Sequence, residues 1–239
     1  MGGCDANGFS AEFGQAHSVK LDLKLIADIG LVGFPNAGKS TLLKAISAAK
    51  PKIASYPFTT IRPNIGVVTY NDGRHISIAD LPGLIEGAHM NMGMGHTFLK
   101  HVERTNVIVY VVDLHGFQLG PQYAKRSVLE TVLLLVKELE LYQEDLLNKR
   151  AILALNKCDL PDSYEKVMKV RDTFENEKLY ADFIETVPSN FVPKGHFSFE
   201  KIIPISASKD KNSVLVLKNI IRKELDIIDE EKRLLRATS

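Results

Sequence analysis

The feature that most constrains the fold is the segment Gly33-Phe34-Pro35-Asn36-Ala37-Gly38-Lys39-Ser40, which lies between an apolar run, 26–32, and a helix-forming stretch, 41–49. The spacing GxxxxGKS between a strand and a helix is typical of a P-loop. Gly33 and Gly38 let the backbone turn so that successive N–H groups point inward, and the positive end of the next helix adds to phosphate binding. We expect Lys39 to reach the β- and γ-phosphates of a nucleotide and the Ser40 hydroxyl to bind Mg²⁺.

Composition excludes several classes of protein. The 239 residues carry a net charge of +1, so the chain lacks the overall basic character typical of nucleic-acid-binding proteins, which leaves a local basic patch open, and two cysteines do not suggest a disulfide framework. No run of about 18 apolar residues predicts a membrane span. The first twenty residues hold Asp5, Glu12 and a single basic residue, Lys20, which is unlike a transit peptide. We expect an irregular extension over 1–21, a nucleotide-binding domain over 22–229 and a frayed, charged tail over 230–239.

The order of apolar runs predicts an α/β fold. We expect strands at 29–32, 65–70, 76–79, 107–112, 151–155 and 201–205, and helices at 41–49, 97–104, 127–147, 164–178 and 213–228. Strands that alternate with helices favour a mostly parallel sheet with helices on both faces, which makes three layers. Asn71-Asp72-Gly73 is a hairpin signal, so the six-stranded sheet should carry one antiparallel edge strand.

Two further segments suit the phosphate end of a nucleotide. Asp80-Leu81-Pro82-Gly83 follows a predicted strand, so Asp80 can hold Mg²⁺ through a water and the Gly83 N–H can turn onto a γ-phosphate. The alternative is that Asp80 is only a turn residue at the end of a strand and has no role in metal binding. Thr59 and Thr60 lie in the loop before the second strand, where one hydroxyl, preferably that of Thr60, can bind Mg²⁺ when the γ-phosphate is present. That loop would then act as a switch.

The segment Asn156-Lys157-Cys158-Asp159 follows a buried strand and suits a guanine base. The Asp159 carboxylate can accept hydrogen bonds from guanine N1–H and N2–H₂, a pair of donors that adenine lacks, which would favour guanine about a hundredfold or more. We expect Asn156 to tie this loop to the P-loop, the Lys157 stem to pack on the base, and the Ala207 N–H of Ser206-Ala207-Ser208 to bond guanine O6. The predicted nucleotide contacts are Gly33, Phe34, Pro35, Asn36, Ala37, Gly38, Lys39, Ser40, Thr41, Phe58, Thr59, Thr60, Ile61, Arg62, Asp80, Leu81, Pro82, Gly83, Asn156, Lys157, Cys158, Asp159, Ser206, Ala207 and Ser208.

These motifs, in this order, resemble the Obg subfamily of P-loop GTPases. The resemblance rests on 33–40, 49–54, 56–60, 78–88, 93–95 and 98–104, and it spans Asp22 to about Ile228. It implies a monomeric switch that hydrolyses GTP and assists assembly of the large ribosomal subunit, in the mitochondrion or alternatively the nucleolus. Obg proteins carry a Gly-rich domain ahead of this one, for docking on the ribosome. Only 1–20 precedes it here, which leaves docking by this chain open.

The mechanism of hydrolysis is less fixed by the sequence. Leu84 and Ile85 follow Gly83, where Ras-type GTPases place a glutamine that orients water, so we expect slow turnover. The Asn36 side chain could help bind K⁺ beside the phosphates, which would neutralise developing charge; the alternative is that Asn36 only suits a turn. The predicted catalytic set is Asn36, Lys39, Thr60 and Gly83. One rival function is a nucleotide-dependent protein-binding module with negligible turnover. The other is a P-loop ATPase or kinase, which the preference of Asp159 for guanine argues against.

Overall fold

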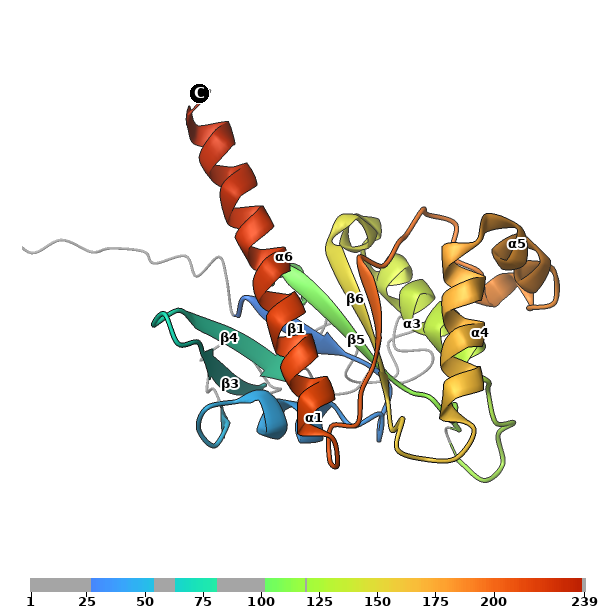
Figure 1. Cartoon of the computed structure of the whole chain (residues 1–239). Coiled ribbons are helices and arrows are strands. Elements are labelled where there is room, and N and C mark those ends of the chain that lie inside the picture. Colours follow the sequence, from blue (N-terminus) through green and yellow to red (C-terminus); the bar gives the residue numbers. More distant parts are fainter. Residues whose placement is uncertain (1–26, 54–62, 81–101, 119, 238–239) are drawn as a thin grey trace, which may run out of the picture.

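A seven-stranded sheet forms the centre of the protein (Figure 1). The computed structural model describes residues 27–53, 63–80, 102–118 and 120–237. The strand order is β2-β3-β4-β1-β5-β6-β7, and β4, β1, β5, β6 and β7 are parallel neighbours. The strands are β1 (Ile29–Val32), β2 (Lys52–Ile53), β3 (Asn64–Thr69), β4 (His75–Asp80), β5 (Val107–Asp113), β6 (Arg150–Asn156) and β7 (Lys201–Pro204). The predicted α/β class is confirmed.

The prediction of six strands was wrong by one. β3 is antiparallel to β4 as expected, but it is not the edge, because β2 pairs with it on the other side. β2 is only two residues long and both are exposed, so it carries none of the apolar alternation that predicts a strand. The outer edge of β3 is also protected further along, where the N–H of Ala48 donates to the carbonyl of Val67 at 2.9 Å.

Helices cover both faces of the sheet, so the three predicted layers are present. They are α1 (Lys39–Ile46), α3 (Val128–Tyr142), α4 (Ser163–Glu175), α5 (Glu177–Glu185) and α6 (Lys211–Ala237), with short 3₁₀ helices η2 (Glu144–Asn148) and η3 (Ser189–Phe191). Alternate residues of β5 point to opposite faces: Val109 packs with α1 and α6, whereas Ile108 packs with α3 and α4. Within the described residues, no helix is long and apolar enough to span a membrane.

Several helices differ from their predicted bounds. The stretch 127–147 is divided into α3 and η2, because Gln143 is extended and ends the longer helix. The helix predicted at 164–178 ends at Glu175, and Asn176 caps a new helix, α5, by accepting hydrogen bonds from the next N–H groups. The helix predicted at 97–104 lies mainly outside the described residues, as does the extension 1–21.

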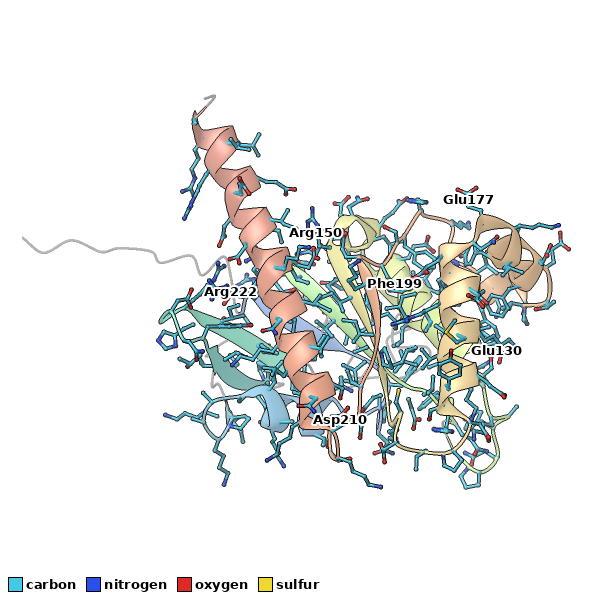
Figure 2. The ribbon with its side chains drawn as sticks, in the orientation of Figure 1. Glu130, Arg150, Glu177, Phe199, Asp210 and Arg222 are labelled. Carbon is cyan, nitrogen blue, oxygen red and sulfur yellow. The ribbon has the colours of Figure 1, made fainter. Side chains whose placement is uncertain are left out.

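The last helix is longer than its apolar pattern predicts. We expected it over 213–228, followed by a frayed tail, but α6 continues to Ala237. Polar contacts hold the added turns to the sheet: Arg150 Nη2 lies 3.2 Å from Glu231, and Lys232 Nζ donates to Asn106 at 3.0 Å. Figure 2 shows Arg150, at the start of β6, at the end of the sheet opposite to Asp210, which precedes α6. Polar contacts with Arg150 of β6 and with Asn106 therefore hold the part of the helix whose leucines, Leu234 and Leu235, are exposed.

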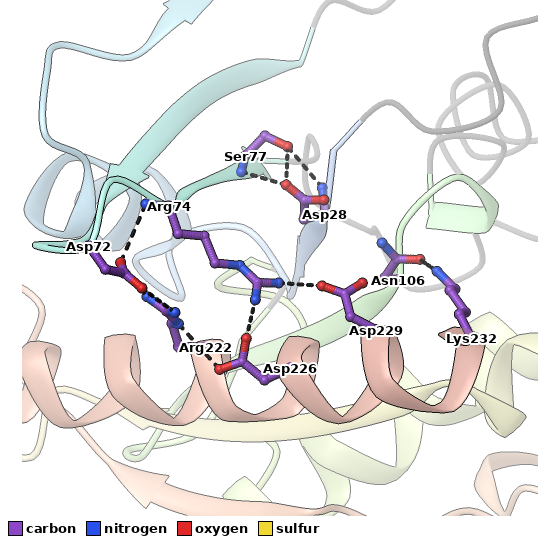
Figure 3. Close-up of polar contacts among 9 residues, drawn as sticks. All are labelled: Asp28, Asp72, Arg74, Ser77, Asn106, Arg222, Asp226, Asp229 and Lys232. Atoms are coloured by element: carbon purple, nitrogen blue, oxygen red, sulfur yellow. Dashed lines mark hydrogen bonds and ion pairs between the residues drawn. The ribbon is translucent and has the colours of Figure 1, made fainter. Parts of the chain in front are cut away.

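α6 also holds the hairpin that joins β3 to β4 (Figure 3). Arg222 makes two hydrogen bonds to the Asp72 carboxylate, at 2.6 and 2.7 Å, and Arg74 bonds Asp226 and Asp229, the latter at 2.7 Å. The Tyr70 hydroxyl donates to the carbonyl of Lys218 at 2.7 Å. Because β4 ends at Asp80, this contact fixes the strand that delivers a predicted site residue.

Candidate nucleotide-binding site

The predicted motifs meet at one edge of the sheet, beyond the carboxyl ends of the parallel strands. The loops that follow β5, β6 and β7 gather along the lower edge of the view in Figure 1. This is where open α/β sheets bind ligands. A pocket of about 440 Å³ opens there, lined by Asn36, Gly38, Lys39, Ser40, Thr41, Asn156, Lys157, Asp159, Leu160, Ala207 and Ser208. Residues from three distant parts of the sequence thus form one site.

The two glycines of the P-loop are required by close approach and by backbone conformation. A Cβ atom on Gly33 would lie 2.2 Å from the carbonyl oxygen of Val111 on β5. Gly38 has φ +99°, and a Cβ atom there would lie 2.1 Å from Nδ2 of Asn156. Asn36 also has a positive φ, 62°, which asparagine tolerates better than most residues. The loop therefore packs directly against β5 and β6.

Lys39 lies in the middle of the P-loop, with only 7% of its surface exposed. Its ammonium donates to the carbonyls of Gly33, at 2.8 Å, and Phe34, at 3.1 Å. Burial lowers the pKa of Lys39, and the nearby Asp80 carboxylate opposes that shift. A phosphate beside this ammonium would supply the negative charge that its surroundings only partly provide.

Ser40 and Asp80 meet where we expect Mg²⁺. The Ser40 hydroxyl donates to the Asp80 carboxylate at 2.5 Å, and Asp80 is 5% exposed. Burial raises the pKa of Asp80, against the hydrogen bond from Ser40 and the charge of Lys39. A hydroxyl and a carboxylate fit Mg²⁺, which uses oxygen ligands and takes most of its coordination from waters and phosphates. Within the described residues, no cluster of three His, Cys, Asp or Glu side chains forms a metal site, so the expected Mg²⁺ donors that the structure describes are Ser40 and Asp80.

Asn156 joins three loops of the site. Its Nδ2 donates to the carbonyl of Ala37 in the P-loop at 2.8 Å, as predicted, and its Oδ1 accepts from the N–H of Ala207 at 3.1 Å. This second bond was not predicted, and it involves the same Ala207 N–H that we expect to reach guanine O6. A bond from Ala207 to a base would have to replace or share this contact.

The Asp159 carboxylate is held in an ionised state at the edge of the pocket. Its Oδ1 accepts from the Ser206 hydroxyl at 2.6 Å, and its Oδ2 lies 3.0 Å from Nζ of Lys209. The hydrogen bond from Ser206, followed by the one from Lys209, keeps the pKa of Asp159 below its ordinary value. An ionised carboxylate that lines this pocket is suited to accept two N–H donors from a base.

Other predicted residues do not line the pocket. Phe34 is buried and stacks on Phe117, with ring centroids 4.4 Å apart, and Pro35 and Ala37 border a smaller neighbouring cavity. Burial raises the pKa of the Cys158 thiol to about 11, which makes it a poor nucleophile at neutral pH. The predicted contacts Phe58, Thr59, Thr60, Ile61, Arg62, Leu81, Pro82 and Gly83 lie outside the described residues.

Two charged residues at the site were missing from the sequence prediction. Asp113, at the end of β5, lies 2.6 Å from Nζ of Lys157, and Lys209 pairs with Asp159 as described above. Asp113 could have been found, because it follows a buried parallel strand and so belongs to the same edge of the sheet as the other motifs. Lys209 had no such signal, since its position one residue beyond Ser206-Ala207-Ser208 gains meaning only once the loop is folded.

The fold and this arrangement of loops define a P-loop GTPase. The family model for "50S ribosome-binding GTPase" matches residues 28–157. The match covers more than half of the chain, and the chain therefore belongs to this family.

Curated relatives place the chain more closely. It is 53% identical over 233 residues to GTP-binding protein 10 of Danio rerio, covering 96% of this chain and 60% of that protein. It is 52% identical over 226 residues to GTP-binding protein 10 of Homo sapiens, covering 95% and 57%. GTPase Obg of Oceanobacillus iheyensis is 48% identical over 168 residues, covering 70% and 38%. The resemblance to the Obg subfamily is confirmed, and the chain spans about 60% of the length of the first two relatives.

Solved structures agree on the fold alone. The cytosolic domain of FeoB from L. pneumophila matches with a TM-score of 0.53 at 21% identity, covering 82% of this chain and 67% of that one. The cytosolic domain of the T. maritima FeoB iron transporter, in a GDP form, matches with a TM-score of 0.53 at 18% identity, covering 84% and 64%. Both support the three-layer architecture.

Proposed function

We propose that this protein binds GTP and hydrolyses it to GDP and phosphate, and that the two nucleotide states form a switch. One observation carries the proposal: a single pocket is lined by a P-loop lysine and serine, Lys39 and Ser40, and by the ionised Asp159. The first two suit phosphates, and the third suits the guanine edge. Membership of the GTPase family supports the same conclusion.

The residues of the pocket divide the work of binding. The Lys39 ammonium bonds two P-loop carbonyls and would bond phosphate oxygens in their place when a nucleotide binds. The N-terminal end of α1 adds a positive dipole at the same position. Ser40 and Asp80 would hold Mg²⁺, which when bound neutralises phosphate charge. Asn156 fixes the distance between the phosphate and base ends of the pocket, because it bonds the P-loop directly.

We expect turnover to depend on potassium. Asn36 lines the pocket, so its side-chain carbonyl is available to a monovalent cation beside the phosphates. The measurement is phosphate release under multiple turnover in potassium chloride and in sodium chloride at equal ionic strength. Turnover should be faster in potassium, and Asn36→Ala should remove the difference without abolishing GDP binding.

Equal turnover in the two salts would contradict the role of Asn36. Absence of turnover in both salts, with GDP still bound, would instead favour the protein-binding module without hydrolysis. Failure to bind any guanine nucleotide would overturn the proposed function itself. Asn71→Ala is the matched control, because Asn71 is an exposed asparagine in the turn between β3 and β4 that does not line the pocket.

We further propose that the switch assists assembly of the large ribosomal subunit, in the mitochondrion or alternatively the nucleolus. The family description names 50S ribosome binding, and the resemblance to the Obg subfamily also supports a role at the large ribosomal subunit. The test is cosedimentation with mitochondrial large-subunit particles, and in parallel with nucleolar precursor particles, in a non-hydrolysable GTP analogue and in GDP. We expect binding in the analogue only.

Lys39→Met is the control for nonspecific electrostatic attraction between the protein and the particles. It keeps nearly all charges of the chain but should not bind nucleotide, so it should not cosediment. Binding that is equal in the analogue and in GDP would contradict a switch. Absence of binding to either particle in both states would show that this chain does not carry a sufficient docking surface.

A further inference from the structure

Asp113 occupies a junction that the predicted motifs do not include. It is the last residue of β5 and lies opposite Asn156 in the parallel register of β5 and β6. One carboxylate oxygen lies 2.6 Å from Nζ of Lys157, and the other accepts the N–H of His115 at 2.9 Å. Both oxygens are therefore engaged, and the side chain is only 20% exposed.

Lys157 is the residue that this contact controls. It lines the pocket between Asn156 and the base-recognising Asp159, and its φ is +68°. A residue with a side chain is uncommon in this left-handed region and stays there only when its surroundings hold it. The ion pair with Asp113 fixes the far end of the Lys157 side chain, so the stem between the two fixed ends has a defined direction along the pocket wall.

The neighbouring polar groups have other partners, and Asp113 is the carboxylate that pairs with Lys157. Asp159 is paired with Ser206 and Lys209 on the other side of the loop. Lys166 of α4 contacts the ring of His115 at 2.9 Å. The two carboxylates thus have different partners: we expect Asp159 to face the edge of a base, whereas Asp113 holds Lys157.

We propose that Asp113 is a positioning residue for nucleotide binding, which acts through Lys157 by holding its stem against the face of the purine base. The inference rests on the proposed function. It differs from the role of Asp159 in one measurable way: contact with the face of a ring does not depend on the groups at its edge. Loss of Asp113 should therefore weaken binding of different purine nucleotides by the same factor, whereas loss of Asp159 should change the preference among them.

The experiment measures the dissociation constants of GDP and of IDP, whose base lacks the amino group of guanine. Asp113→Asn removes the charge and keeps an oxygen that can accept the His115 N–H. Lys157→Met keeps a long stem, removes the ammonium and is neither more nor less strained by the positive φ. We expect each variant to raise both dissociation constants by about fivefold, the effect of an ion pair that is partly exposed to solvent.

The double variant decides the mechanism. If Asp113 acts through Lys157, Asp113→Asn should have no further effect in the Lys157→Met background, so that the two effects do not multiply. Asp162→Asn is the control, because Asp162 is an exposed aspartate of the same loop, and it should leave both constants unchanged. The melting temperature without nucleotide reports whether each variant folds.

Three outcomes would overturn the inference: unchanged affinity in Asp113→Asn, effects that multiply in the double variant, or a changed ratio between GDP and IDP. If the wild-type protein binds neither nucleotide, the proposed function fails and this inference fails with it, which is a different result from a wild type that binds and a variant that binds equally well.

Discussion

Replacing Asp159 by asparagine is expected to weaken GDP binding by about a hundredfold and to reverse the preference for guanine over xanthine. The carboxylate accepts hydrogen bonds from guanine N1–H and N2–H₂, whereas the asparagine amide would place a donor opposite the guanine amino group. Xanthine carries a carbonyl at that position, so the amide suits it. The measurement is the dissociation constants of GDP, XDP and ADP for wild type and variant.

Asp162→Asn, in the same loop, should leave all three constants unchanged. Because the hydrogen bond from Ser206 and the Lys209 ammonium keep the pKa of Asp159 below its ordinary value, its ionised form persists as the pH falls. The ratio of GDP to ADP affinity should therefore stay constant from about pH 8 to about pH 5 and fall only below that. GDP affinity that survives Asp159→Asn would disprove base recognition by this carboxylate.

Replacing Lys39 by methionine is expected to abolish nucleotide binding without unfolding the protein. At a GDP concentration one hundred times its dissociation constant, wild type should gain about 2.7 kcal/mol and melt roughly 5–10 °C higher. The variant should gain nothing under the same conditions and should not release phosphate from GTP. Lys39 is the only positive residue of the P-loop segment 33–40 and its side chain is buried, so no other residue of this segment replaces it.

The nucleotide-free variant should melt within about 3 °C of wild type. Burial lowers the pKa of Lys39, which means that its charged form is less stable here than in water, so we expect an apolar side chain of similar length to be tolerated. Lys44→Met, on the exposed face of α1, is the control and should keep the full response to GDP. A Lys39→Met protein that GDP stabilises as much as wild type would contradict phosphate binding at this loop.

Much of the architecture follows from patterns that are local in the sequence. Buried parallel strands such as β5 and β6 are continuous apolar runs, and the glycines of the P-loop mark a turn that no other residue fits. The end of α6 was harder to predict, because its final turns are held by the ion pair between Glu231 and Arg150 and by the hydrogen bond from Lys232 to Asn106, and not by a buried apolar face. β2 was missed for a related reason: it is defined by its pairing with β3 alone.

The residue pattern alone predicts the chemistry of the site: a phosphate loop, an Asp that we expect to hold Mg²⁺, a carboxylate that we expect to face guanine, and strands whose carboxyl ends meet at one edge. Each of these depends on residue types at short, fixed spacings. The tertiary structure decided how the pieces hold one another, since Asn156 reaches Ala37 and Asp113 reaches Lys157 across more than forty residues. Such contacts depend on the register of neighbouring strands, which no local pattern encodes. For the same reason only the folded protein shows that the loop 156–159 is held by Asp113 at the end of β5.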